Sequence, residues 1–123
     1  MSGSDLSIYC WILGDRYEHV FQVEISRNKI IATLKDAIKA EKQNTLKDID
    51  TCSLILYKVS IPYTPQLAEH ATALELDELK LNSFDELSEV FVNGLLHKHV
   101  HVVVEIPSGV WVYIALSSLW QLH

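Results

Sequence analysis

The stretch His97–Pro107, which reads HKHVHVVVEIP, decides the fold because it predicts the final strand of the domain. Side chains alternate between the two faces of a strand, so Val100, Val102 and Val104 share one apolar face. The opposite face carries His97, His99, His101, Val103 and Glu105. Pro107 has no N–H group to donate to a neighbouring strand, and it therefore closes the element. We expect a strand over residues 98–106 with one face for the core and one face rich in imidazole.

Three further segments carry the period of two that predicts strands. Residues 6–13 and 19–25 alternate apolar and polar side chains, and the short turn between them predicts an antiparallel hairpin. Residues 53–59 alternate again, with Leu54 and Leu56 on one face. The first half of the chain therefore supplies a hairpin and a third strand.

Residues 29–42 change to helical spacing, because Ile31, Leu34 and Ile38 recur three and four positions apart. Asn28 is placed to act as the N-cap of this helix. The opposite side, which we expect to face solvent, carries Lys35, Asp36, Lys39 and Lys42. The pattern predicts one amphipathic helix that lies on a sheet.

The segment between the third and the last strand is less regular. Two prolines predict a loop over residues 62–73, and the following residues 73–76 read as a short edge strand. Ser83 and Glu86 have the spacing of a capping box, which predicts a short helix over residues 84–92.

These elements define an α+β fold with a mixed sheet of four or five strands, one main helix on one face and a short second helix. Their order is similar to that of a ubiquitin-like β-grasp. In that topology the first and last strands pair in parallel at the centre of the sheet, and the main helix crosses one face.

Length and composition narrow the class of protein. The 123 residues are enough for one domain that buries its own core. A net charge of −6 excludes the cationic surface that nucleic acid or an anionic membrane requires. No uninterrupted apolar run is long enough for a membrane span, and the N-terminus shows no recognisable signal peptide. Cys10 and Cys52 are expected to be free, buried thiols.

Three blocks of the sequence resemble the N-terminal module of Crinkler effectors. The first is the LKxxIxxE helix that contains Leu34, Lys35 and Ile38. The second, residues 54–62, stands where oomycete members carry LxLFLAK and looks like a fungal variant of that box. The third is the closing HVxVxxP. The matching positions are Leu34, Lys35, Ile38, Leu54, Leu56, Tyr57, His101, Val102, Val104 and Pro107.

This resemblance implies that residues 1–107 are the ubiquitin-like N-terminal module of a secreted effector, which enters a host cell, with the host nucleus as one destination, and contacts host proteins. No catalytic domain fits into residues 108–123, an apolar tail of unknown role, so no enzymatic activity and no cofactor are expected. The tail is one route to self-association. The alternative function is an intracellular ubiquitin-like adaptor that never leaves its own cell, and a small enzyme or metal protein is a third.

If the helix covers one face of the sheet, the other face presents an aromatic patch. Tyrosine and tryptophan are enriched at protein interfaces, so this patch is a candidate partner surface. Its residues are Tyr9, Trp11, Ile55, Tyr57, His99, His101 and Val103. The alternative is that the C-terminal tail covers the same face.

The histidine row allows three interpretations. Neighbouring imidazoles at His97, His99 and His101 could hold a zinc ion, but no third and fourth ligand is evident, and no metal site is predicted. A solvated strand face is the simplest interpretation, and a pH-responsive surface is the third, because imidazole titrates near pH 6.5. No catalytic motif accompanies the row.

Overall fold

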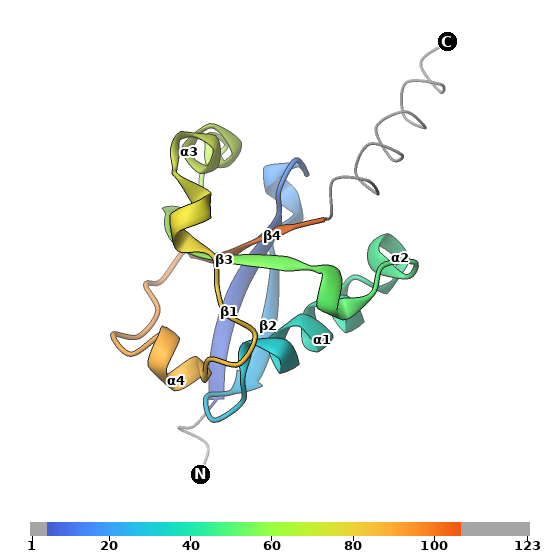
Figure 1. Cartoon of the computed structure of the whole chain (residues 1–123). Helices are drawn as coiled ribbons and strands as arrows, with labels where there is room; N and C mark the ends of the chain where they lie inside the picture. Colours follow the sequence, from blue (N-terminus) through green and yellow to red (C-terminus); the bar gives the residue numbers. More distant parts are fainter. Residues whose placement is uncertain (1–4, 107–123) are drawn as a thin grey trace.

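The protein, described by a computed structural model over residues 5–106, is built on a four-stranded mixed sheet (Figure 1). The strands are β1 (Asp5–Ile12), β2 (Phe21–Ser26), β3 (Ile55–Pro62) and β4 (His99–Glu105). Their spatial order is β2-β1-β4-β3. The strands predicted from the periodicity are all present, with bounds that shift by a few residues.

The two central strands are the first and the last along the chain. β1 runs antiparallel to β2 and parallel to β4, and β3 runs antiparallel to β4. This confirms the predicted parallel pair at the centre of the sheet. Strand β4 is paired on both sides, which is why its sequence is nearly continuous in valine rather than strictly alternating.

Helix α1 (Ile31–Glu41) crosses one face of this sheet, called here the inner face. The shorter elements are α2 (Gln43–Leu46), α3 (Leu67–Ala73) and α4 (Leu87–Val90), with the 3-10 turns η2 (Tyr17–His19), η3 (Thr51–Ser53) and η4 (Leu76–Leu79). The main core lies between α1 and the sheet, where Leu34, Ile38 and Leu56 are fully buried. The architecture is an α+β fold consistent with a β-grasp.

The opposite, outer face is also covered. Helix α3 and turn η4 lie over it, above β3 in Figure 1, and bury a second core. The sequence predicted a loop over residues 62–73 and an edge strand over 73–76, and both expectations are wrong. Leu67 and Ala71 are four positions apart on α3, so a helix of only two turns can turn both side chains into this core.

Strict alternation fails at one point of the sheet. The register between β3 and β4 shifts between Lys58 and Ile61, where β3 carries an extra residue. Such a bulge reverses which side chains face which layer beyond it. On β3, Tyr57 and Ile61 both face the outer core, and Val100, which pairs with Ile61, lies there too and not with Val102 in the inner core. This corrects the predicted apolar face of β4.

The start of α1 is organised by a segment distant in sequence, residues 81–88, called here the strap. The N–H groups of Ile31 and Ala32 donate to the carbonyls of Asp85 and Ser83, both at 2.9 Å. Neither Asn28 nor Ser83 caps a helix with its side chain, and α4 begins only at Leu87, so the predicted caps are wrong. Backbone groups of the strap take the place of a side-chain cap.

Candidate functional site

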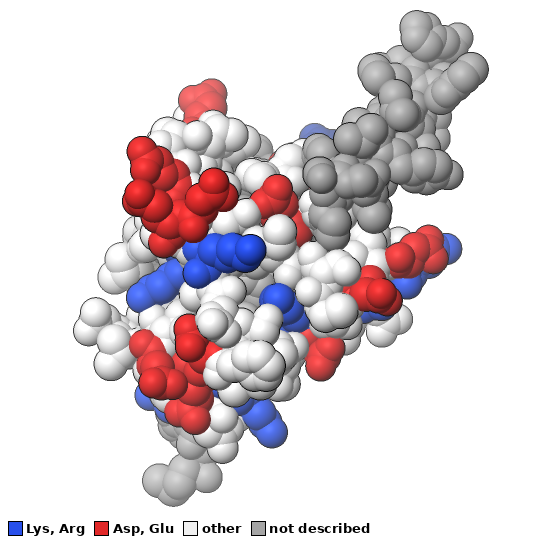
Figure 2. Space-filling model, in the orientation of Figure 1, with Lys and Arg blue, Asp and Glu red and all other residues white. Residues whose placement is uncertain are grey.

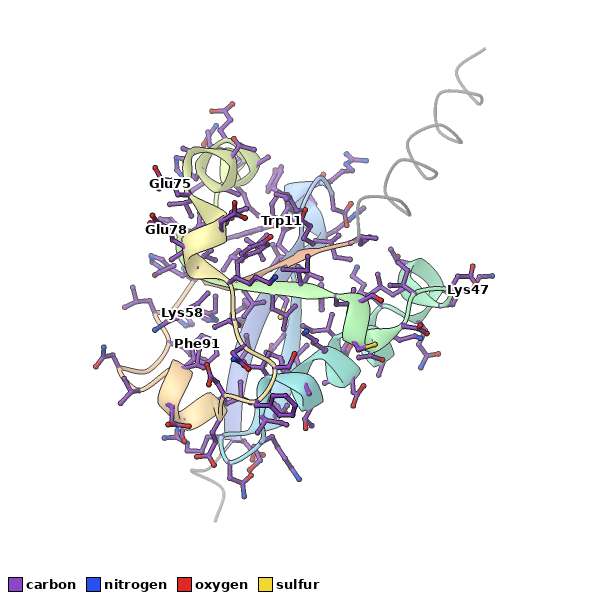
Figure 3. The ribbon with its side chains drawn as sticks, viewed as in Figure 1. Trp11, Lys47, Lys58, Glu75, Glu78 and Phe91 are labelled. Atoms are coloured by element: carbon purple, nitrogen blue, oxygen red, sulfur yellow. The ribbon has the colours of Figure 1, made fainter. Side chains whose placement is uncertain are left out.

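The aromatic patch predicted for the outer face is mostly interior. Trp11 and Val103 are 0% exposed, and Tyr57 and His101 are 4% exposed. Trp11 lies between the sheet and α3 in Figure 3. Only Tyr9, Ile55 and His99, of the residues assigned to the patch, keep partial exposure. The expectation of a contiguous exposed patch is therefore wrong, because α3 and η4 occupy the place of a partner.

The buried aromatic residues satisfy their polar atoms within the fold. The indole Nε1–H of Trp11 donates to the carbonyl of Arg16 at 3.1 Å, and the Tyr57 hydroxyl donates to the Glu105 carboxylate. Burial, followed by this hydrogen bond and the charge of Glu105, raises the pKa of Tyr57 well above its ordinary value. Tyr57 therefore stays neutral and structural.

The motif residues contribute to the core rather than to a surface. Leu34, Ile38, Leu54, Leu56, Val102 and Val104 all lie in the inner core. Pro107 falls outside the described residues. The tail, residues 108–123, does so as well. The resemblance therefore rests largely on positions whose common role is packing.

Lys35 differs from the other motif residues because it is a nearly buried cation, 7% exposed, and not the solvent-facing residue we expected. Its Nζ donates to the Ser83 hydroxyl at 2.9 Å, which ties α1 to the strap. Loss of hydration lowers the pKa of Lys35, the nearby Cys52 thiol raises it and the charge of Lys80 lowers it further. Within residues 5–106 no carboxylate lies at ion-pair distance from this ammonium group.

His101 connects two strands through its ring. The N–H of Tyr9 donates to His101 Nδ1 at 3.1 Å, and His101 Nε2 lies 2.8 Å from the carbonyl oxygen of Leu96. Burial lowers the pKa of His101, as does the neighbouring His99, while the hydrogen bond to Leu96 raises it. The predicted solvated row of histidines is thus wrong for His101, whereas His97 is exposed and His99 half-buried.

The surface next to this ring is hollowed into an apolar pocket of about 270 Å³, called here the aromatic pocket. It is lined by Tyr9, Val20, Tyr63, His97, Lys98, His99 and Val100. None of these described lining residues is acidic, and Lys98 lies at the rim. Tyr9 and His99, two residues of the predicted patch, both line this pocket.

The backbone of the pocket is strained at Lys98. Its φ is +57°, a left-handed conformation that costs a residue with a Cβ roughly 1–2 kcal/mol. The Tyr63 N–H donates to the Lys98 carbonyl at 3.0 Å, and His99 Nδ1 lies 2.8 Å from the carbonyl of His97. Several hydrogen bonds thus hold the loop that forms this wall in place, and strain of this kind is found most often at functional sites.

A second hollow, of about 650 Å³, has the opposite character. It is open and includes the carboxylates of Glu75, Asp77, Glu78 and Glu105. Figure 2 shows acidic side chains gathered over α3 and η4, and Figure 3 places Glu75 and Glu78 there. These two hollows therefore differ in charge and in apolar character: the larger one is lined by carboxylates, and the aromatic pocket has apolar walls next to Lys98.

Metal-binding, membrane-spanning and reactive-thiol sites are the other types to consider. Over residues 5–106 no group of three histidine, cysteine or acidic side chains is arranged to hold a metal ion. In that same range, no helix has both the length and the apolar character to cross a membrane. Cys10 is buried, and burial raises the pKa of its thiol far above its ordinary value, while Cys52 is exposed, which corrects one of the two predicted buried thiols.

Sequence patterns did not predict the residues that form the pocket from outside the sheet. Tyr63 and Val20 lie in connecting segments with no periodic signal. The stacking of Tyr17 against Tyr63, with ring centroids 5.8 Å apart, is likewise a tertiary contact. A tyrosine directly after a proline-terminated strand was the one available signal for Tyr63.

The fold and these residues define a β-grasp-type module that carries a small aromatic pocket. Residues 6–105 match the family described as Crinkler effector protein N-terminal domain. The chain belongs to this family. The resemblance stated from the three sequence blocks is thereby confirmed.

One curated relative is Crinkler effector protein 1 of the fungus Rhizophagus irregularis. It is 28% identical to this chain over 104 residues, which are 85% of this chain and 22% of the relative. The chain thus spans about a fifth of the length of that relative. What the match supports is an effector-type N-terminal module.

Proposed function

We propose that this domain is the N-terminal module of an effector that is secreted, enters host cells and acts there by binding a host protein. The family match over residues 6–105 supports the effector class. The observation that carries the binding role is the aromatic pocket, because apolar concave surfaces with a few polar groups are the usual sites of recognition. In this proposal the domain itself carries no catalytic step.

The pocket indicates the chemistry of its partner. Its walls are the tyrosine rings and two valines, which suit one inserted aliphatic or aromatic side chain. Lys98 and the adjacent imidazoles favour a carboxylate next to that side chain. The proposed partner therefore presents an apolar residue flanked by an acidic one on an accessible segment.

Two substitutions test the pocket. Tyr63→Ser removes an aromatic wall that is 45% exposed, and Lys98→Glu reverses the charge at the rim, so neither disturbs the cores. Proteins captured from host extract by the tagged full chain are quantified by mass spectrometry, and the affinity of the recovered partner is then measured with purified protein. Each variant should bind this partner at least ten times more weakly.

Matched controls separate the pocket from general surface effects. Lys47→Glu makes the same charge change at an exposed position that follows α2, labelled in Figure 3, and does not line the pocket. Phe84→Ser removes an aromatic ring that is 83% exposed and does not line the pocket. Both controls should bind like the wild type. If Tyr63→Ser and Lys98→Glu also bind like the wild type, the pocket is not the contact.

Delivery is tested separately from binding. The tagged protein is expressed in the producing organism, and the culture fluid and host cells are assayed for it. Its appearance in host cells fits the effector proposal. Retention inside the producing cell would instead favour an intracellular adaptor.

A further inference from the structure

The imidazole of His101 is the direct link between the two walls of the aromatic pocket. One wall is Tyr9 on β1, and the other is the loop that carries His97, Lys98 and His99. The ring accepts from the Tyr9 N–H at 3.1 Å and contacts the Leu96 carbonyl, just before this loop, at 2.8 Å. The β1–β4 ladder itself pairs only from Cys10 onward, so at Tyr9 the ring replaces a backbone contact.

The two partners fix the protonation state of the ring. A backbone N–H can only donate, so Nδ1 must be free of hydrogen, and a carbonyl oxygen can only accept, so Nε2 must carry the hydrogen. This is one neutral tautomer. The cation carries hydrogen on both nitrogens, so it would direct an Nδ1–H against the Tyr9 N–H. Protonation therefore keeps the contact with Leu96 and breaks the contact with Tyr9.

In the described part of the chain, no acidic side chain pairs with the ring to compensate for that charge. Tyr9 packs against the ring from β1, with ring centroids 5.7 Å apart, and His99 is the titratable neighbour on β4. His97 and Lys98 are the titratable and charged groups of the loop that forms the pocket wall. Among residues 5–106 no carboxylate forms an ion pair with His101. The groups around the ring thus favour its neutral form.

We propose that His101 is a pH-sensitive latch: its protonation releases Tyr9 and opens the aromatic pocket. Lys98, with its left-handed backbone, lies in the wall on the other side of the pocket, which keeps its contact with His101 through Leu96. Loss of partner binding at acidic pH rests on the function proposed above. The opening itself is a property of the free protein.

The first test follows the latch in the unliganded full chain. The ¹⁵N shifts of the histidine rings and the exchange of the Tyr9 amide are measured by NMR from pH 7.5 to 4.5. At pH 7.5 the His101 ring should show the Nε2–H tautomer. As the ring becomes protonated, the exchange of the Tyr9 amide, corrected for its intrinsic pH dependence, should accelerate at least tenfold, while the Cys10 amide stays protected.

Two variants identify the responsible ring. His101→Asn keeps an acceptor for the Tyr9 N–H but does not titrate, so its Tyr9 amide should show no acid-induced acceleration. His99→Asn removes the neighbouring positive charge, so the response should persist with its midpoint at higher pH. If His101→Asn does not fold, the wild-type titration by itself tests whether protonation of His101 releases the Tyr9 amide.

Three results would overturn the latch: a ring that protonates without faster Tyr9 exchange, a ring that stays neutral to pH 4.5, or a response that survives in His101→Asn. The affinity of a partner recovered with the wild-type chain should fall at least tenfold between pH 7.5 and the pH at which the ring is protonated. If Tyr9 responds and this affinity does not, the latch stands and the pocket is not the binding contact.

Discussion

Both faces of the sheet are covered by helices, but the two helices differ in length and in sequence pattern. The inner face lies under α1, which has 11 residues and an apolar stripe. The outer face lies under α3, which has 7 residues and begins shortly after a proline-containing loop. Both cores contain fully buried leucine, for example Leu34 inside and Leu67 outside.

A second helix layer on the sheet can cover a surface that would otherwise be open to a partner. A sheet with one helix layer leaves an apolar outer face that another protein could bind. Here the chain supplies its own second layer, which takes Trp11 and Tyr57 out of reach. The aromatic pocket, which includes Tyr9 and His99, is the part of the predicted patch that stays accessible.

The largest expected effect is at the inner core. Leu34→Ala removes a side chain that is 0% exposed and should lower the free energy of unfolding by about 4 kcal/mol, because a cavity adds to the lost burial. Denaturant unfolding of the wild type and the variant measures this loss of stability. A loss below about 1 kcal/mol would mean that the inner core is not the main source of stability.

The matching change at the outer core is Leu67→Ala, also 0% exposed. We expect a loss of about 3 kcal/mol, since a short helix can settle into part of the cavity. Amide exchange should show that β1 opens only with global unfolding while α3 opens locally. If the amides of β1 lose their protection from exchange together with those of α3, the two layers unfold as one cooperative unit. The proposed difference in stability between the two faces is then wrong.

The link between α1 and the strap is tested by Ser83→Ala. This change leaves the Lys35 ammonium without its hydroxyl partner at 2.9 Å and should cost about 1–2 kcal/mol, as for hydrogen bonds to charged groups. The control is Ser7→Ala on the exposed side of β1. Equal stability of the two variants would show that Lys35 is satisfied by water.

Acid should weaken the fold through His101. Because its pKa in the folded state lies below the ordinary 6.5, the unfolded chain binds the proton more readily. The stability that neutral His101 contributes is fully present above about pH 6.5, and it is lost as the pH falls through the lower pKa of the folded state. Thermal unfolding of the wild type and His101→Asn across pH 7.5 to 5 measures the difference, which should be smaller than the Leu67→Ala effect. If the unfolding temperatures of the two proteins change with pH in parallel, His101 is not the source of the acid sensitivity.

The smallest effect is expected at Phe84, which is 83% exposed on the strap. Phe84→Ala should change the stability by less than about 0.5 kcal/mol. Phe91→Ala, at 6% exposure and with Lys58 Nζ 5.9 Å from its ring, should cost about 3–4 kcal/mol. Similar losses for the two phenylalanines would show that Phe84 is buried in solution.

The predictable part of the fold is the part with a regular period. The hairpin and α1 follow from alternation and helical spacing, whereas the central β1–β4 pair follows from the likeness of the element order to a β-grasp. The family resemblance follows from motif positions in these elements. The site was harder to predict. Exposure of Trp11 and Tyr57 was inferred from strand alternation, which shows which face a side chain takes but not what lies over that face.

Local sequence was sufficient for the four strands and for the main helix, because the spacing of apolar residues shows which side chains of a segment are buried. The strand order and the family came from the resemblance of these elements and motifs to a known topology and family. Three features emerged only from the folded chain: α3 closes the outer face, a bulge moves Val100 to that face, and His101 links Tyr9 to Leu96. Each of these depends on contacts between distant residues. No local pattern encodes such contacts, since a short helix or an extra strand residue becomes favourable only against the surface it covers.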